Sequence, residues 1–171
     1  MKHRTAEKTF WMAWLGVFGV ALLPALLATL PPFLGVEGRA VVMNAFARFC
    51  HQMPSRSPHL LGVQLAVGHR TYGMLVGLAL GSLAVLFLLQ WTGVLDRYMP
   101  RVLAAAALPM AVDWGLGVLG LWANTPLSRM LTGGLFGLVA GYYVTQGLVP
   151  TQAFEPTEPS LTREPTTGKP S

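Results

Sequence analysis

The sequence contains few charged residues. Asp, Glu, Lys and Arg together make up 11% of its 171 residues, less than half of the roughly 25% that is usual in soluble domains. Hydrophobic residues make up 53%. A water-soluble protein of this composition would have too little polar surface, so lipid must solvate much of the chain. The length allows one domain.

Cysteine and the common catalytic motifs are also scarce. Cys50 is the only cysteine, so no internal disulfide can form, and the cysteine count does not indicate a redox compartment. The sequence has no phosphate-binding loop, no serine nucleophile elbow, no HExxH pair and no paired catalytic carboxylates. These absences favour a non-enzymatic protein.

Positive charge is in excess but dispersed. Twelve Lys and Arg residues against seven Asp and Glu residues give a net charge of +5. The basic residues are scattered singly between apolar segments, so nucleic acid is not an expected partner. We expect them to flank membrane spans and to contact anionic lipid headgroups.

Four apolar segments have the length of membrane spans, over residues 10–30, 72–91, 102–122 and 130–149. As a helix, the first would rise about 31 Å, which matches a hydrocarbon core of about 30 Å. It is longer than the apolar region of a signal peptide, so we interpret it as an uncleaved span. The sequence therefore predicts an all-α, four-helix membrane domain over residues 1–149. Residues 150–171, rich in Pro and Thr, are predicted to be a disordered tail.

The longest connection, residues 35–71, carries most of the polar residues. Its first part, up to Cys50, has polar and apolar residues on opposite faces of a helix, which is typical of an amphipathic helix at the membrane surface. The apolar stretch 59–67 is too short to span. It is either a re-entrant segment or the start of a long, tilted second helix, and the sequence does not decide between them.

Glycine recurs at every fourth position in the second and fourth spans. Such stripes let a neighbouring backbone approach closely. We therefore expect them to be helix-packing surfaces, within the protein or against a partner, and expect leucine to damage them far more than alanine. The stripes consist of Gly73, Gly77 and Gly81, and of Gly133, Gly137 and Gly141.

Polar residues in and after the long connection form a candidate cluster. Asp113 lies in the middle of the third span, where an unpaired carboxylate costs several kcal/mol. Its predicted partner is Arg70 or Arg129, and the alternative is a proton or cation relay in a small carrier or channel. The whole predicted structural cluster consists of Cys50, His51, Gln52, Arg56, Arg70, Asp113 and Arg129.

A metal site is the alternative use of the same loop. Cys50 and His51, with His69 as a further ligand, offer chemistry suited to zinc or copper. Adjacent residues of a helix point about 100° apart, so Cys50 and His51 could not chelate one ion unaided. We favour the simpler interpretation of a buried cysteine beside a hydrogen-bonded histidine.

The motif Cys50-His51-Gln52-x-Pro54-x-Arg56-Ser57 resembles a signature of small prokaryotic membrane proteins known as domain of unknown function 2085. In that family a Cys-x-Arg-Cys-x-Gly element follows at the head of the next span. Here Arg70 and Gly73 match that element, while Gly68 and Thr71 replace its two cysteines. Further on, Asp113, Arg129, Thr132 and Gly133 match a third element. The resemblance implies a membrane fold and no particular activity, and the missing cysteines favour a hydrogen-bonded cluster over a metal centre.

The distribution of basic residues suggests an orientation. With four spans, seven Lys and Arg residues lie on the side of the termini and five on the other side. This bias predicts cytoplasmic termini in a prokaryotic plasma membrane. The expected function is that of a membrane subunit or accessory protein, with lipid and other membrane subunits or a second copy as partners. Metal-binding or redox-linked activity at Cys50 and His51, and transport through Asp113, are the alternatives.

Overall fold

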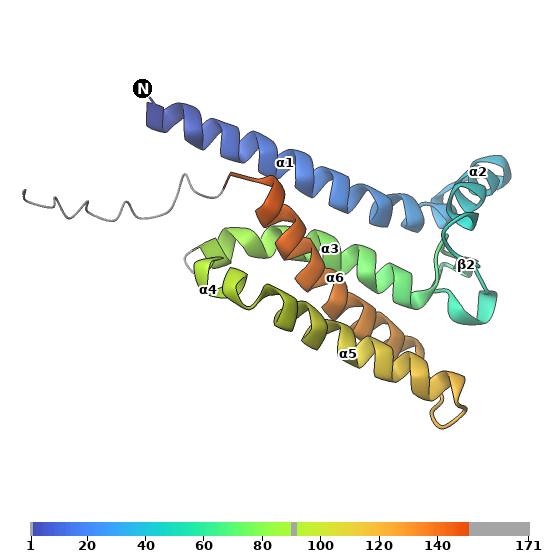
Figure 1. Cartoon of the computed structure of the whole chain (residues 1–171). Coiled ribbons are helices and arrows are strands. Elements are labelled where there is room, and N and C mark those ends of the chain that lie inside the picture. Colours follow the sequence, from blue (N-terminus) through green and yellow to red (C-terminus); the bar gives the residue numbers. More distant parts are fainter. Residues whose placement is uncertain (1, 90–91, 151–171) are drawn as a thin grey trace, which may run out of the picture.

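The computed structural model describes residues 2–89 and 92–150 and is mainly helical (Figure 1). The predicted tail lies outside the described residues from position 151 onward. Two short 3₁₀ turns, η1 and η2, and one small hairpin interrupt the helices. In chain order the elements are α1 (Lys2–Thr29), η1 (Pro31–Phe33), α2 (Val36–Ala47), η2 (Pro54–Arg56), β1 (His59–Leu60), β2 (Val63–Gln64), α3 (His69–Leu88), α4 (Thr92–Arg97), α5 (Met99–Val118) and α6 (Pro126–Leu148).

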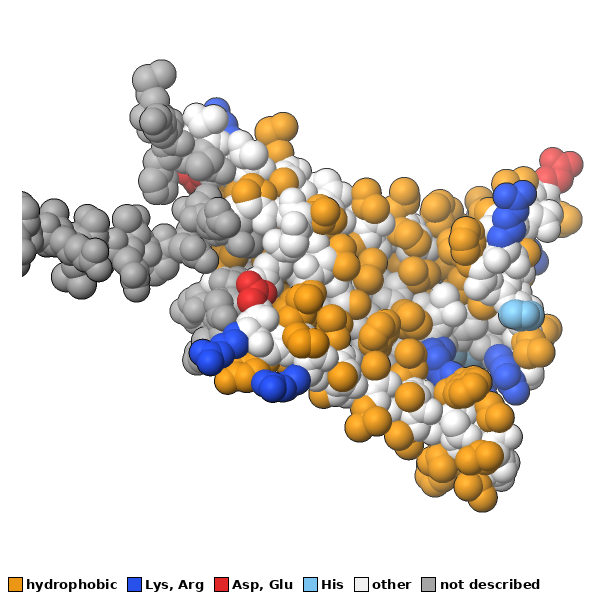
Figure 2. Space-filling view, viewed as in Figure 1, with side chains coloured by type: hydrophobic (Ala, Val, Ile, Leu, Met, Phe, Trp, Pro, Cys, Tyr) orange, Lys and Arg blue, Asp and Glu red, His pale blue; other side chains and the backbone are white. Residues whose placement is uncertain are grey.

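Three of the helices are long and apolar enough to cross a membrane: α1 over Glu7–Thr29, α3, and α5. Helix α6 has 23 residues but lies outside this group, because its glycine, tyrosine and glutamine residues lower its mean hydropathy. Hydrophobic side chains cover the middle of the molecule, while Lys and Arg side chains gather toward its two ends (Figure 2). This distribution is the one expected of a protein that lies across a bilayer.

Each predicted span corresponds to one long helix, but each helix begins before the predicted span. α1 begins at Lys2, α3 at His69, α5 at Met99 and α6 at Pro126. The prediction followed hydropathy, whereas the first turn of each helix contains polar or proline residues that do not interrupt it. Proline is tolerated there because the first turn has no intrahelical partners for its N–H groups.

Helices α3 and α6 run parallel with their backbones in direct contact. The two glycine stripes face each other: Gly73, Gly77 and Gly81 lie against the backbone of Met130–Tyr142, while the stripe of α6 lies against the backbone of Arg70–Leu78. A Cβ added at any of these six positions would come closer than 3.0 Å to a backbone carbonyl oxygen. The stripes therefore pack within the chain and are not surfaces for a second subunit. Even the methyl group of alanine would overlap the facing backbone, so alanine should also be damaging, and the larger effect expected of leucine stays a prediction.

Helix α1 packs along α3 in the opposite direction. Near its start, Trp14 donates its indole N–H to the carbonyl oxygen of Ser82, at 2.9 Å. At its other end, Ala28 packs against Ala66 and Val67. Helix α5 leads back along α6, so that α4 lies at one end of the molecule, with the start of α1 (Figure 1). Helix α2, the hairpin and the turn between α5 and α6 lie at the other end.

The apolar stretch 59–67 is not the start of the second helix, which begins only at His69, while its re-entrant placement in the membrane stays a prediction. β1 and β2 pair as a short antiparallel hairpin, with His59 opposite Gln64. Leu61 and Gly62 make its turn with φ values of 53° and 75°, the left-handed region that a tight turn uses. Residues 65–67 then run buried under the end of α1. Helix α2 is present where an amphipathic helix was predicted, although none of its residues is buried.

Candidate functional site

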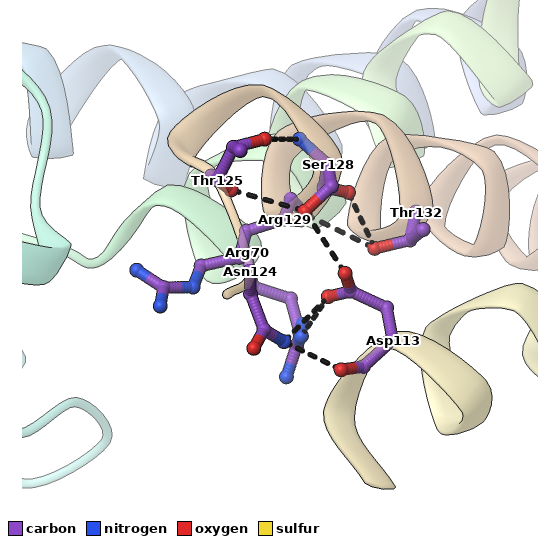
Figure 3. A network of polar contacts seen from close by, with 7 residues as sticks. All are labelled: Arg70, Asp113, Asn124, Thr125, Ser128, Arg129 and Thr132. Atoms are coloured by element: carbon purple, nitrogen blue, oxygen red, sulfur yellow. Dashed lines mark hydrogen bonds and ion pairs between the residues drawn. The ribbon is translucent and has the colours of Figure 1, made fainter. Parts of the chain in front are cut away.

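The site is built around the buried carboxylate of Asp113. This side chain is 8% exposed and lies where α3, α5 and α6 meet (Figure 3). Arg70 of α3 forms an ion pair with its Oδ2. Ser128 Oγ donates to Oδ1 at 2.9 Å, and Asn124 Nδ2 donates to Oδ2 at 3.1 Å. Both oxygens therefore have partners, as a buried carboxylate requires.

The same contacts fix the turn between α5 and α6. Asn124 also donates to the backbone oxygen of Asp113, so one amide closes the turn onto the preceding helix. Thr125 caps α6, because its Oγ1 accepts a hydrogen bond from the backbone N–H of Ser128 at 3.1 Å. Pro126 follows at the first helical position, where its fixed φ suits a helix start. Sequence reasoning did not single out Asn124 or Ser128, although their place in a turn beside a buried acid was the available signal.

Gln52 makes hydrogen bonds across the connection 35–71, which we call the motif loop. Its backbone has a positive φ of 47°, which is uncommon outside glycine. Its side-chain amide donates to the backbone oxygens of Met43 and Ala66, at 2.7 Å and 2.9 Å. Gln64 in turn donates to the backbone oxygen of Gln52 at 2.7 Å. This residue therefore joins the last turns of α2 to the hairpin and to the segment that leads into α3.

Cys50 and His69 have local partners, whereas His51 is exposed. The backbone N–H of Gly68 donates to Cys50 Sγ at 3.3 Å, and His69 Nδ1 lies 2.7 Å from the carbonyl oxygen of Arg56. Across residues 2–89 and 92–150, no three His, Cys, Asp or Glu side chains gather closely enough to hold a metal ion. The predicted metal ligands Cys50, His51 and His69 thus lie near one another without forming such a group, and metal binding there stays a prediction.

A cavity of about 480 Å³ opens beside this network, between the motif loop and the starts of α3 and α6. We call it the arginine cavity. A smaller cavity of about 120 Å³ adjoins it and shares four of its lining residues. The lining common to both consists of Arg56, Arg70, Trp114 and Arg129. The structure thereby brings together three arginines that the sequence analysis had named separately.

Only one of the three arginines is neutralised. Within the described part of the chain, Asp113 is the one acidic partner of Arg70, and neither Arg56 nor Arg129 has an ion pair. The guanidinium group of Arg129 extends away from Asp113 (Figure 3). Three guanidinium groups less one carboxylate leave a charge of +2 on these four side chains. The Nε atom of Arg70 is buried and has no hydrogen-bond partner among the described residues.

The comparisons with known proteins bear on this same region. The model of a family of predicted membrane proteins, domain of unknown function 2085, matches residues 50–143. The chain belongs to this family. The matched residues begin at Cys50 and include the arginine cavity and its buried acid, while α1 and α2 lie outside them. A protein of Methanocaldococcus jannaschii, named Uncharacterized protein MJ1492, is similar to it, with 31% identity over 101 residues.

That similarity covers 58% of this chain and 63% of the archaeal protein. The chain thus spans less than two thirds of the length of this relative. No solved structure matches the chain. The family identifies a membrane protein, and the chemistry of the site has to be inferred from its own residues.

Proposed function

We propose that this chain is a non-enzymatic, four-span membrane protein that binds an anionic group in the arginine cavity. The observation that carries the proposal is the convergence of Arg56, Arg70 and Arg129 on adjoining cavities with a single carboxylate among them. Guanidinium groups stay protonated at any physiological pH and offer paired donors that match phosphate and carboxylate oxygens. Arg70 and Arg129 are half-buried, so their contacts are screened less than contacts in water.

The packing of α6 supports its assignment as the fourth span. Helix α6 is in backbone contact with α3 from Gly133 to Gly141, so it lies at the same depth in the membrane as α3. Its polar residues face partners within the protein: Tyr143 donates to the carbonyl oxygen of Leu95 at 3.0 Å, and Gln146 Nε2 donates to Asp96 Oδ1 at 2.7 Å. Satisfied polar groups of this kind help a helix of modest hydropathy to cross, although the Tyr142 hydroxyl and Gln146 Oε1 are buried without a hydrogen-bond partner in the described residues.

The cavity arginines also bear on orientation. If Arg56, Arg70 and Arg129 hold a ligand, they should not be counted among the basic residues that set the orientation in the membrane. The count of seven against five basic residues then becomes more unequal, which strengthens the case for cytoplasmic termini. The arginine cavity would then open toward the non-cytoplasmic face, because α2 and the hairpin lie at the end of the molecule opposite the start of α1 (Figure 1).

A carrier or channel that depends on Asp113 is less well supported. Both carboxylate oxygens are engaged by Arg70, Asn124 and Ser128. A proton or cation relay would have to break these hydrogen bonds and expose the charge of Arg70. The network instead supports a fixed acid that holds one arginine in place.

Thermal unfolding of the purified chain in detergent tests the anion site, with inorganic phosphate as the probe. Phosphate replaces chloride at constant ionic strength. Bound phosphate at ten times its dissociation constant would stabilise the fold by about 1.4 kcal/mol. We expect this gain in the wild type and in Arg101→Gln, which removes an arginine from the opposite end, and its loss in Arg129→Gln. An equal gain in all three proteins would contradict the proposal.

A further inference from the structure

A second, apolar cavity adjoins the arginine cavity. It has a volume of about 620 Å³ and lies between α1, α2 and the start of α3. Its walls are almost entirely hydrocarbon, from Leu23 and Leu27 of α1, Ala45 and Phe46 of α2, and Leu75 of α3. We call it the apolar cavity. Both cavities fall in the range of roughly 300–1,000 Å³ that is typical of small-molecule sites.

Two residues line both cavities, Phe49 and Thr71. The basic and the apolar spaces therefore meet without an intervening element. Phe49 stands at this junction with 85% of its surface exposed, an unusual exposure for an aromatic side chain in the polar motif loop. A ligand that reaches from one space into the other would cover it.

We infer that the ligand is an acidic phospholipid, whose phosphate lies among the arginines and whose acyl chain lies in the apolar cavity. The inference rests on the anion site proposed above and names its ligand class. A free phosphate or a small carboxylate would match the charge and leave the apolar cavity unused. A zwitterionic lipid would fill the apolar cavity, but its cationic headgroup would meet Arg56 and Arg129, which have no acidic partner in the described residues.

The membrane supplies this ligand by lateral diffusion. The apolar cavity is open and is bordered by exposed side chains of α1, including Leu23 and Leu27, so an acyl chain can enter from the bilayer. Arg129 and Arg70, at the headgroup position, are half-buried. The phosphate would there gain charge-assisted hydrogen bonds in a partly dry setting, which are stronger than those at an open surface.

The test measures lipid binding by native mass spectrometry of the full chain released from detergent. Phosphatidylglycerol and phosphatidylcholine with identical acyl chains are compared, and glycerol phosphate serves as the soluble headgroup in thermal unfolding. Ala45→Trp places a large side chain in the apolar cavity from α2, and Leu23→Trp does so from α1. Both positions are exposed, so the indole can be accommodated without repacking the core. Val144→Trp is the matched control, in another apolar cavity between α1 and α6 that shares only Val20 with the apolar cavity and does not border the arginine cavity.

We expect phosphatidylglycerol to bind at least about tenfold more tightly than phosphatidylcholine. Ala45→Trp and Leu23→Trp should weaken phosphatidylglycerol binding by a similar factor and leave stabilisation by glycerol phosphate unchanged. Arg129→Gln should weaken both, and Val144→Trp neither. Equal binding of the two lipids, or full lipid binding in both cavity-filling variants, would overturn the lipid assignment. The anion site itself would fail if Arg129→Gln left stabilisation by glycerol phosphate intact.

Discussion

Replacing Gly137 by alanine adds one methyl group at the contact between α3 and α6. The new Cβ would come within 3.0 Å of three backbone atoms of Met74. Backbone atoms of a helix cannot rotate away as a side chain can, so the two helices would have to separate until ordinary contact at 3.4 Å or more is restored. Overpacking of this kind costs about 1–3 kcal/mol. The glycines one turn away would lose their close contacts as well, which favours the upper part of that range.

Gly134→Ala is the matched control for this substitution. Gly134 lies three residues before Gly137 in the same helix, and its added Cβ would meet the carbonyl oxygen of Gly73 at 3.6 Å, an ordinary contact. Both substitutions change helix propensity by the same amount, about 1 kcal/mol in favour of alanine. That term cancels in the comparison, so the difference between the two variants isolates the steric cost.

The assay is unfolding of the purified chain in mixed micelles by titration with sodium dodecyl sulfate, followed by far-ultraviolet circular dichroism. We expect Gly137→Ala to unfold at a clearly lower fraction of this detergent than Gly134→Ala, and Gly134→Ala to be at least as stable as the wild type. Coincident unfolding curves for the two variants would refute the close parallel packing of α3 and α6.

Three further predictions concern the site and its orientation. Asp113→Asn should lower the free energy of unfolding by about 1–3 kcal/mol, because it leaves Arg70 partly buried and unpaired. Adding Arg70→Gln to this variant should recover part of that loss. Strictly additive losses from the two substitutions would contradict the pairing. Ser55→Cys in a Cys50→Ser background should react with an impermeant maleimide in intact cells, whereas reaction only after lysis would reverse the orientation. Elemental analysis should find the same low zinc and copper content in the wild type and in Cys50→Ser, and stoichiometric metal lost on this substitution would favour the metal alternative.

The positions of the long helices could be predicted from the sequence, but which helices pack against one another could not. Hydropathy located the four long helices because each is a continuous apolar run, and a period of four residues identified the packing faces. A stripe does not specify its partner, so the parallel docking of α3 on α6 could not be derived from it. The apolar residues of the stretch 59–67 were compatible with an early start of the second helix, whereas the turn at Leu61 and Gly62 makes a hairpin there.

The residues of the site were visible in the sequence, but their arrangement was not. Asp113 stood out because a mid-span acid needs a partner, and the structure shows Arg70 in that position while Arg129 stays free of acidic contacts in the described residues. The cavity depends on distances between residues far apart in the chain, from Arg56 to Arg129, which no local pattern encodes. The apolar cavity beside it depends on how α2 folds back over α1, and this is equally invisible in a linear pattern.

Asp113 explains both the stability and the charge of the site. A buried carboxylate is tolerated here because Arg70 of α3, Asn124 of the following turn and Ser128 of α6 satisfy it, and these same contacts close the turn that starts α6. Asp113 forms an ion pair only with Arg70, so it neutralises one guanidinium group. Arg56 and Arg129 are left without acidic partners in the described chain. A second acid would have reduced the charge of the three arginines to +1, and no acid would have left three like charges to repel one another. The arrangement therefore holds the helices together and still presents positive charge to a ligand.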